Sequence, residues 1–447
     1  MSIQQESLLN NVINLRGVLK NEIQQSTYIT HKIHNFYPAK FIPQVPRFVI
    51  NLFQLKNKII LDPFAGSGTT AVESLITENS VISNDINPLT NFLINVKTLK
   101  FEGKNYYYYL EKLEQYLISI KSHDGQFTPN WKNIDYWYEQ DFLNELTKIW
   151  SYICNIDDKD QLKLILQASA LYVSRKYSYG DDKVPKLFKS KQKKELVKIY
   201  LKEFKKDRNI MLYDLYGKAK EYLNLILQLN KNYNLDYENI KSIDKYKIGR
   251  FNLVIKSSIE ELENRIPNNY VDCIITSPPY IYAQEYFRST KIDLYWLNLI
   301  DDGILKKLTE KEIGQKRSLV FDMNSTLLKI KSYEKALNII EKSALGMNPA
   351  ENIARFKAYF NDMFYFIKSS KNLLLRNGKL AIFIGEPKIF GQPIPAKDIF
   401  VEMMEYEGLK LRHELFDTIK SRHLQSGRLN LNPQGIQGEW LIIGEKL

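Results

Sequence analysis

The fold is decided by the stretch Lys58-Ile59-Ile60-Leu61-Asp62-Pro63-Phe64-Ala65-Gly66-Ser67-Gly68-Thr69-Thr70. Its apolar beginning predicts a short buried strand, and its glycine-rich loop predicts a turn into a helix at 71–77. The next segment, Val81-Ile82-Ser83-Asn84-Asp85, predicts a second strand that ends in an acidic residue. A strand, a glycine loop, a helix and a second strand form a βαβ unit, which implies a parallel sheet.

Outward from this unit, strands and helices continue to alternate along the chain. Apolar runs predict further strands at 251–255, 271–275, 379–384, 413–418 and 439–443, and helical periodicity occurs at 87–98, 353–375 and 397–407. We therefore predict an α/β fold with a doubly wound sheet, formed by 1–99, 251–300 and 353–447.

Two segments interrupt this alternation. Residues 100–250 are rich in Tyr, Lys and Asn and have helical periodicity at 106–119, 141–156, 160–172 and 191–204. We predict that they form one large, mostly helical insertion domain between the second and third strands. The polar and basic stretch 301–352 predicts a second insertion.

The overall composition is that of a basic globular protein. The 447 residues include 63 Lys and Arg against 51 Asp and Glu, a formal net charge of +12, which favours a polyanionic partner. The two cysteines, Cys154 and Cys273, exclude a disulfide framework, and neither they nor the five histidines have metal-ligand spacing. Because no apolar run of roughly 18 residues and no secretory signal pattern occur, we expect a cytoplasmic protein with no metal and no membrane span.

The glycine loop predicts a nucleoside site. Glycines at a strand-to-helix turn let the backbone approach a ligand closely, and Asp85 stands where a carboxylate meets ribose hydroxyls in nucleotide-binding βαβ units. The loop lacks the Lys of a phosphate-binding P-loop and the third glycine of a dinucleotide loop. The pattern favours a nucleoside without a pyrophosphate, and a simple tight turn is the alternative.

A second motif, Thr276-Ser277-Pro278-Pro279-Tyr280, follows the predicted strand at 271–275 directly. The prolines remove two backbone donors and fix φ, so the carbonyls of Ser277 and Pro278 are held rigidly. The Ser277 hydroxyl and the Pro278 carbonyl can accept hydrogen bonds from a planar amino group, and Tyr280 offers a flat face to a ring. This arrangement suits the exocyclic amine of a heteroaromatic base; prolines that merely end a strand are the alternative.

Together these motifs resemble a known family. Residues 62–70 and 277–280 resemble motifs I and IV of the DNA amino-methyltransferases, which use S-adenosylmethionine to methylate N4 of cytosine or N6 of adenine. Residues 34–43 resemble motif X of a subset of these enzymes. The resemblance implies a Rossmann-like methyltransferase sheet as the catalytic domain. Residues 257–260 stand where motif III would follow the third strand, but they lack the Asp that is usual there.

The resemblance also implies roles for individual residues. The catalytic residues would be Ser277, Pro278, Pro279 and Tyr280. The cofactor would contact Tyr37, Pro38, Ala39, Lys40, Asp62, Phe64, Gly66, Gly68, Thr69, Asp85 and Ser258.

The resemblance favours one base without excluding others. In the family, Ser at the first position of motif IV leans towards N4 of cytosine, and Asp leans towards N6 of adenine. We therefore expect methylation of a cytosine flipped out of duplex DNA. Methylation of adenine at N6, methylation of an RNA base and a non-catalytic nucleic-acid-binding scaffold are the alternatives.

The insertions are the candidates for DNA recognition. Basic residues among aromatic ones suit phosphate contacts, although a solvated charged face gives the same pattern. We expect 100–250 to be a target-recognition domain and 301–352 to add further contacts. The partners would be double-stranded DNA and, if the chain serves a restriction–modification system, a cognate restriction endonuclease. The candidate DNA-binding residues are Arg175, Lys176, Lys189, Lys191, Arg288 and Arg317.

Overall fold

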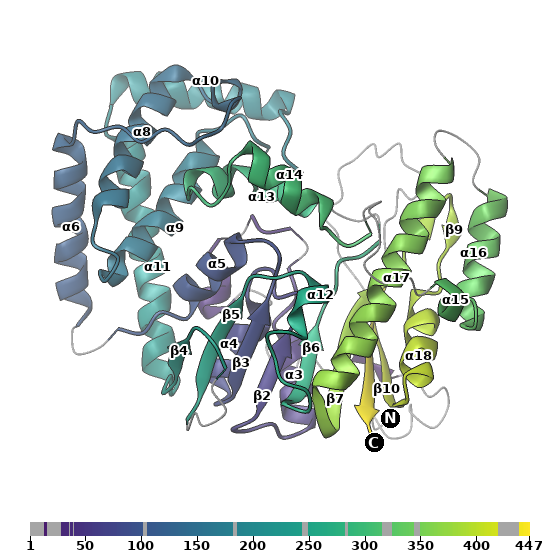
Figure 1. The fold of residues 1–447 in the computed structure, drawn as a ribbon. Helices are drawn as coiled ribbons and strands as arrows, with labels where there is room; N and C mark the ends of the chain where they lie inside the picture. Colours follow the sequence, from purple (N-terminus) through teal and green to yellow (C-terminus); the bar gives the residue numbers. More distant parts are fainter. Residues whose placement is uncertain are drawn as a thin grey trace.

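The computed structural model describes residues 13–15, 28–34, 36–38, 40–101, 105–181, 186–243, 249–281, 285–314, 324–343, 349–418 and 438–447. Within these residues a nine-stranded sheet runs through the molecule in the order β1-β10-β11-β7-β6-β2-β3-β5-β4 (Figure 1). The strands are β1 (Ile13–Asn14), β2 (Ile59–Asp62), β3 (Ser80–Asn84), β4 (Glu238–Ile240), β5 (Phe251–Ile255), β6 (Val271–Thr276), β7 (Leu374–Gly385), β10 (Leu409–Thr418) and β11 (Gly438–Lys446).

The centre of the sheet is parallel and fully covered. Strand β2 pairs in parallel with β3 and β6, β3 pairs with β5, and β6 pairs with β7. Every residue of β3 is buried, as expected for a parallel strand with helices on both faces. Strand β11 is antiparallel to its neighbours β7 and β10. The predicted α/β fold with a doubly wound sheet is confirmed.

Helices cover the two faces of the sheet because neighbouring strand residues point in opposite directions. Ile60 packs with α3, whereas Leu61 packs with α17 and α18. One face carries α3 (Gln44–Leu52), α4 (Thr69–Ile76) and α5 (Leu89–Lys97). The other face carries α12 (Ile259–Leu262), α17 (Pro349–Leu373) and α18 (Ala396–Tyr406), with α15 (Asn324–Leu327), α16 (Lys331–Ser343) and the hairpin of β8 (Lys388–Ile389) and β9 (Gln392–Pro393) beside them.

Between β3 and β4 the chain forms a helical lobe beside the sheet, at the left of Figure 1. We use "helical lobe" for α6 (Tyr106–Ser122), α7 (Ile134–Trp137), α8 (Gln140–Asn155), α9 (Gln161–Lys176), α10 (Lys191–Lys206) and α11 (Ile210–Asn232). Four of these helices begin and end within a few residues of their predicted positions. The longest, α11, was not predicted, and β4 lies inside the predicted insertion 100–250 although it is an edge strand of the sheet.

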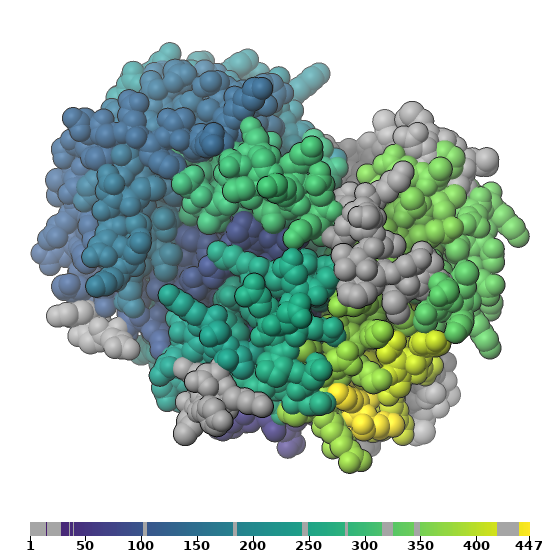
Figure 2. Space-filling view, in the orientation of Figure 1, coloured from purple at the N-terminus to yellow at the C-terminus, as the bar shows by residue number. Residues whose placement is uncertain are grey.

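The lobe shares a hydrophobic core with the sheet domain. Leu89 and Leu93 of α5 belong to the same buried cluster as the lobe helices and as Trp296. That tryptophan ends α13 (Tyr286–Trp296), which leads through α14 (Asp302–Glu310) along the lobe. The Trp296 ring stacks on Trp150 at a centroid distance of 5.7 Å, and its Nε1 donates to the Tyr138 hydroxyl at 2.8 Å. Figure 2 shows α13 and α14, in green, lying between the blue lobe and the yellow-green helices.

Candidate active site

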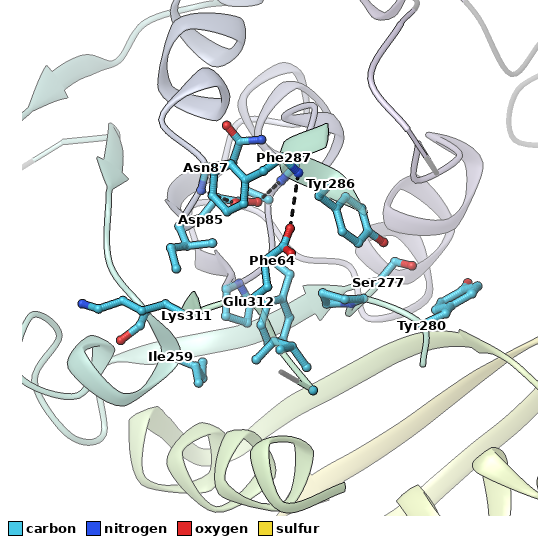
Figure 3. Close-up of a pocket in the computed structure, with 18 of the residues that line it drawn as sticks. Phe64, Asp85, Asn87, Ile259, Ser277, Tyr280, Tyr286, Phe287, Lys311 and Glu312 are labelled. Atoms are coloured by element: carbon cyan, nitrogen blue, oxygen red, sulfur yellow. Dashed lines mark hydrogen bonds between the residues drawn. The ribbon is translucent and has the colours of Figure 1, made fainter. Parts of the chain in front are cut away.

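A cavity of about 410 Å³ lies at the carboxyl edge of the parallel strands (Figure 3). This is the edge at which α/β sheets bind their ligands, and the volume lies in the range of small-molecule sites. Its floor comes from the segments that follow β2, β3, β5 and β6. Its other walls come from Tyr37, Lys40, Phe41, α13, 311–314 and α17. The predicted residues that line the cavity are Tyr37, Lys40, Phe64, Gly66, Asp85, Ser258, Ser277, Pro279 and Tyr280.

Asp85 presents a carboxylate to this cavity from the end of β3. Its Oδ2 accepts from the backbone N–H of Gly66 at 2.8 Å, and its Oδ1 accepts from that of Asn87 at 2.8 Å. Burial raises the pKa of Asp85 to about 6, against the opposing effect of these two hydrogen bonds. The group is therefore mostly ionised at neutral pH and can accept hydrogen bonds from hydroxyl groups of a ligand.

Gly66 occupies a position that only glycine fits well. Its φ of +49° is left-handed, and a Cβ atom there would lie 3.1 Å from Cε1 of Tyr37. The loop backbone and the Tyr37 ring thus approach each other across the cavity wall.

Four other predicted cofactor residues are described by the structure but do not line the cavity: Pro38, Asp62, Gly68 and Thr69. Asp62 accepts from Oγ1 of Thr276 at 2.7 Å and from the Phe64 N–H at 3.1 Å, so it ties β2 to β6. Burial raises its pKa to about 6. Asp62, Gly68 and Thr69 shape the loop and the helix start behind it. Pro38 does not line the cavity, and Ala39 lies outside the described residues.

Gly68 and Thr69 fix the start of the helix behind the loop. Gly68 precedes α4 with φ +80°, and a Cβ atom there would lie 2.5 Å from Cγ1 of Ile94. The Thr69 hydroxyl donates to the Phe41 carbonyl at 3.1 Å. Since Phe41 lines the cavity, Thr69 acts on the site through that residue.

The motif after β6 opens on the same cavity. Ser277, Pro279 and Tyr280 line it, and Pro278 lines a side cavity of about 80 Å³ that shares Ser277 and Tyr280 with the larger one. The Tyr280 hydroxyl donates to Oε1 of Glu439 on β11 at 2.8 Å. Burial raises the pKa of Tyr280 well above its ordinary value, so the phenol stays neutral. The hydrogen bond to Glu439 holds the ring that the sequence predicted as a stacking face.

The segment before α3 is anchored by a buried acid on α4. His31 Nε2 lies 2.7 Å from Oε1 of Glu73, and Nε of Arg47 donates to its Oε2 at 2.8 Å. Tyr28 also donates to Glu73. The Glu73 side chain is fully buried. This contact sets the path of the chain into Tyr37 and Lys40.

Two lysines carry amines into the interior beside the glycine loop. Lys97 of α5 is buried, and its Nζ donates to the Ser67 carbonyl at 2.6 Å. Burial lowers the pKa of Lys97 well below its ordinary value and lowers that of Lys40 to about 8. Lys40 lines both cavities, so it brings a hydrogen-bond donor to the end of the site that contains Ser277.

The turn that follows β5 is held by an amide side chain. Asn84 accepts from the N–H of Ser257 at 3.1 Å and from its hydroxyl at 2.9 Å, and donates to the carbonyls of Pro63 and Ser257. The next residue, Ser258, lines the cavity. It stands where the motif III acid was expected.

Arg175 is a structural residue, and its prediction as a DNA contact is corrected. It is buried, its Nε donates to Oδ1 of Asp293 at 2.8 Å, and its Nη2 donates to the Ser289 carbonyl at 2.6 Å. Its guanidinium also lies over the Phe36 ring, 5.1 Å from the centroid. Because Asp293 is fully buried, this ion pair fastens α9 to α13 and cannot reach a phosphate.

The other basic candidates lie nearer the surface. Lys176 pairs with Asp214 at 2.6 Å, and Arg288 pairs with Glu285 at 3.0 Å. Lys189 places its Nζ 3.6 Å from the ring centroid of Tyr136. Lys191 is exposed at the start of α10. Arg317 lies outside the described residues.

Several of these supporting residues were missed from the sequence: Asn84, Glu73, Lys97, Asp293 and Glu439. Each is a polar residue in a helix or strand, and such residues are ordinarily expected to face solvent. For Asp293 the signal that could have raised attention is a charged residue directly between two apolar ones, Ile292 and Leu294. In the part of the chain that the structure describes, no helix is both long and apolar enough to cross a membrane.

Comparison with known proteins identifies similar chains. The sequence model of a DNA methylase family matches residues 4–91. The type II methyltransferase M.MvaI of Kocuria varians is 27% identical over 314 residues, which are 67% of this chain and 64% of that protein. M.BsoBI of Geobacillus stearothermophilus is 25% identical over 320 residues, 68% of this chain and 59% of that protein. This chain therefore spans somewhat less than two thirds of the length of these two relatives.

Among solved structures, a putative DNA modification methylase from Thermus thermophilus, complexed with S-adenosyl-L-methionine, is 13% identical with a TM-score of 0.22. It is matched over 42% of this chain and 53% of its own. The family and sequence matches confirm the predicted resemblance to the DNA amino-methyltransferases of restriction–modification systems.

Proposed function

We propose, with the resemblance to the DNA amino-methyltransferases as the premise, that this chain transfers a methyl group from S-adenosylmethionine to N4 of a flipped cytosine in duplex DNA. The observation that carries the proposal is the shared cavity. Ser277 and Tyr280, which suit a base amine, open on the same space as Gly66 and Asp85, which suit a nucleoside. A methyl donor and a base could thus meet there.

The donor set around the cavity fits S-adenosylmethionine. Asp85 offers a carboxylate to the ribose hydroxyls. The loop backbone at Gly66 lies close to the Tyr37 ring, and this arrangement suits a flat or slender ligand. Lys40 brings a cationic group towards the opposite end, which suits a carboxylate. When bound, this cofactor would supply an electrophilic methyl group on a sulfonium.

The protein's part in the chemistry is positioning. The lone pair of an exocyclic base amine is delocalised into the ring, so the amine is a weak nucleophile. Hydrogen bonds from its two protons to the Ser277 hydroxyl and the Pro278 carbonyl would favour a pyramidal nitrogen that points at the methyl group. This nitrogen would accept the methyl group of a cofactor held by Asp85 and Lys40. The carbon–sulfur bond would break with its electron pair left on sulfur as a neutral thioether, and the nitrogen's surplus proton would leave to solvent water. Interactions that strengthen along this path lower the barrier.

A base inside duplex DNA cannot reach this cavity, so the target nucleotide would be flipped out. Unstacking costs a few kcal/mol. Stacking on the Tyr280 ring, which Glu439 holds in place, would return roughly 1–3 kcal/mol. The helical lobe and 301–352 are the proposed DNA-recognition parts, and a cognate restriction endonuclease is the proposed partner in the cell.

Methyl-labelled S-adenosylmethionine tests the proposal. Purified protein is incubated with the labelled cofactor and genomic DNA, the DNA is digested, and the labelled nucleoside is identified. Label in N4-methylcytosine is the expected result. Label in N6-methyladenine would keep the mechanism and replace the base, and label in RNA but not in DNA would replace the substrate class. No label with either polymer would contradict the proposal.

A further inference from the structure

The segment Lys311–Gly314 brings a carboxylate into the cavity from outside the sheet. Glu312 lines the cavity, and its Oε1 accepts from the Phe287 N–H of α13 at 3.3 Å. Figure 3 shows its side chain pointing into the cavity toward Phe287. No sequence motif pointed to this residue.

The segment contacts a helix of the sheet domain at each end. On one side, Nζ of Lys311 lies 3.2 Å from Oε1 of Glu261 on α12. On the other, the N–H of Gly314 donates to Oδ2 of Asp362 on α17 at 3.0 Å. The contact with α12 places the segment beside the strand end that carries Ser258.

The order of the strands shows which half of the cofactor would lie there. Along the sheet, β6, β2, β3 and β5 are neighbours. Ser277 follows β6, Gly66 follows β2, Asp85 follows β3, and Ser258 follows β5. If the methyl group lies at Ser277, the nucleoside half must extend past Asp85 towards β5. That is the end at which Lys311 meets α12.

Electrostatics agree with this placement. Burial raises the pKa of Tyr286, and the nearby carboxylates of Asp85 and Glu312 raise it further. Both acids therefore lie near one ring in the cavity wall. A carboxylate can accept about four hydrogen bonds, so Glu312 can keep its bond to Phe287 and also accept one from a ligand.

We propose that Glu312 is a cofactor-binding residue that accepts a hydrogen bond from the nucleoside half of S-adenosylmethionine. It would add an acidic group at the β5 end of the cavity, where Ser258 carries none and Glu260 is the other acid of that segment that lines the wall. The inference rests on the proposed function, because it needs the same cavity to hold the same cofactor.

Calorimetry without DNA tests this contact directly. S-adenosylhomocysteine and methylthioadenosine, which lacks the amino-acid half, are titrated into the wild-type protein and into Glu312→Gln. The substitution keeps the size of the side chain and removes its charge. We expect it to weaken both ligands about tenfold, because the hydrogen bond from the ligand would no longer be made to a charged acceptor. Thermal unfolding of each variant without ligand shows whether the fold is kept.

Two matched variants separate this contact from general effects of charge. Glu285→Gln neutralises a rim acid that also lines the cavity but pairs with Lys186 and Arg288, and it should bind both ligands like the wild type. Glu260→Gln neutralises the acid nearest to Ser258 in sequence. If Glu260→Gln loses affinity and Glu312→Gln does not, the inference is wrong.

The remaining outcomes are equally decisive. A loss with S-adenosylhomocysteine but not with methylthioadenosine would put Glu312 against the amino-acid half and overturn the assignment. Equal losses in Glu312→Gln and Glu285→Gln would show a general charge effect and also overturn it. If the wild-type protein binds neither ligand, the proposed function itself fails, which is a distinct result from a silent Glu312.

Discussion

At the scale of single residues, two opposing effects act on the charge of the Asp85 carboxyl group. Burial disfavours its charge, while the N–H groups of Gly66 and Asn87 stabilise it. The result is a carboxylate with a pKa of about 6, close enough to neutrality for its charge to be adjustable. Such a group accepts hydrogen bonds from hydroxyl donors most strongly while it is ionised, because the protonated form has fewer and weaker acceptor sites.

The pH dependence of cofactor binding should therefore report Asp85. As the pH falls through about 6, the group takes up a proton and loses acceptor capacity. We expect the affinity for S-adenosylhomocysteine to be highest near pH 7 and to fall below pH 6 by up to about tenfold per pH unit. A separate fall above about pH 8 is expected as Lys40 loses its charge. Calorimetry at several pH values measures both, and Asp85→Asn should remove only the fall at low pH.

Asp62 provides the matched control for this prediction. Its pKa is also raised to about 6 by burial, but its carboxylate faces Thr276 and does not line the cavity. Asp62→Asn should keep the fall in affinity below pH 6. A fall that survives in Asp85→Asn would assign the titration to another group.

Tyr280 should act on the base and not on the cofactor. Tyr280→Ala is expected to keep the affinity for S-adenosylhomocysteine and to lose turnover, because about 1–3 kcal/mol of base stacking is removed. Tyr280→Phe keeps the ring but loses the hydrogen bond to Glu439, so its turnover should fall less. Steady-state methylation and calorimetry separate the two effects. Equal losses of cofactor affinity in Tyr280→Ala and Asp85→Asn would contradict this division of roles.

At the scale of elements, α4 joins the glycine loop to the segment before α3. Glu73 of α4 is fully buried with Arg47 and His31 around it. Glu73→Ala should lower the free energy of unfolding by about 3–5 kcal/mol, because it leaves the buried part of the Arg47 charge without its partner. Denaturant unfolding measures the change. Glu78, which pairs with Lys56 in an exposed position, is the control, and Glu78→Ala should change stability little.

Helices and strands with a clear hydrophobic period could be predicted from the sequence. The polar residues that contact the site from distant parts of the chain could not. The predicted strand 251–255 has the same bounds as β5, because a short apolar run between polar loops indicates a strand. Helix α11 was missed because Tyr, Asn and Gln interrupt its apolar stripe, and only packing against α9 and α6 explains its length. Residues such as Glu439 and Glu312 reach the site by tertiary approach, which no local pattern records.

At the scale of the whole molecule, the excess of positive charge agrees with the proposed contact with DNA. A protein that neutralises phosphates releases counterions, so its affinity falls with salt concentration in proportion to the number of contacts. The +12 net charge of the chain predicts a steep dependence. The structure divides the basic candidates into buried ones, such as Arg175, and exposed ones, such as Lys191.

Substitutions of Lys191 and Arg175 should therefore have different effects. Lys191→Gln should weaken DNA binding about equally for all sequences and reduce the slope of log affinity against log salt by about 1, with the affinity for S-adenosylhomocysteine unchanged. Arg175→Gln leaves Asp293 buried without its partner, so it should lower the unfolding temperature instead. Fluorescence anisotropy with labelled duplexes at several salt concentrations, beside thermal unfolding, distinguishes the two. If the salt slope is unchanged in Lys191→Gln, Lys191 does not contact a DNA phosphate and the proposed contact at the start of α10 is wrong. The reason is that each lysine bound to a phosphate adds to that slope, so its removal must lower it.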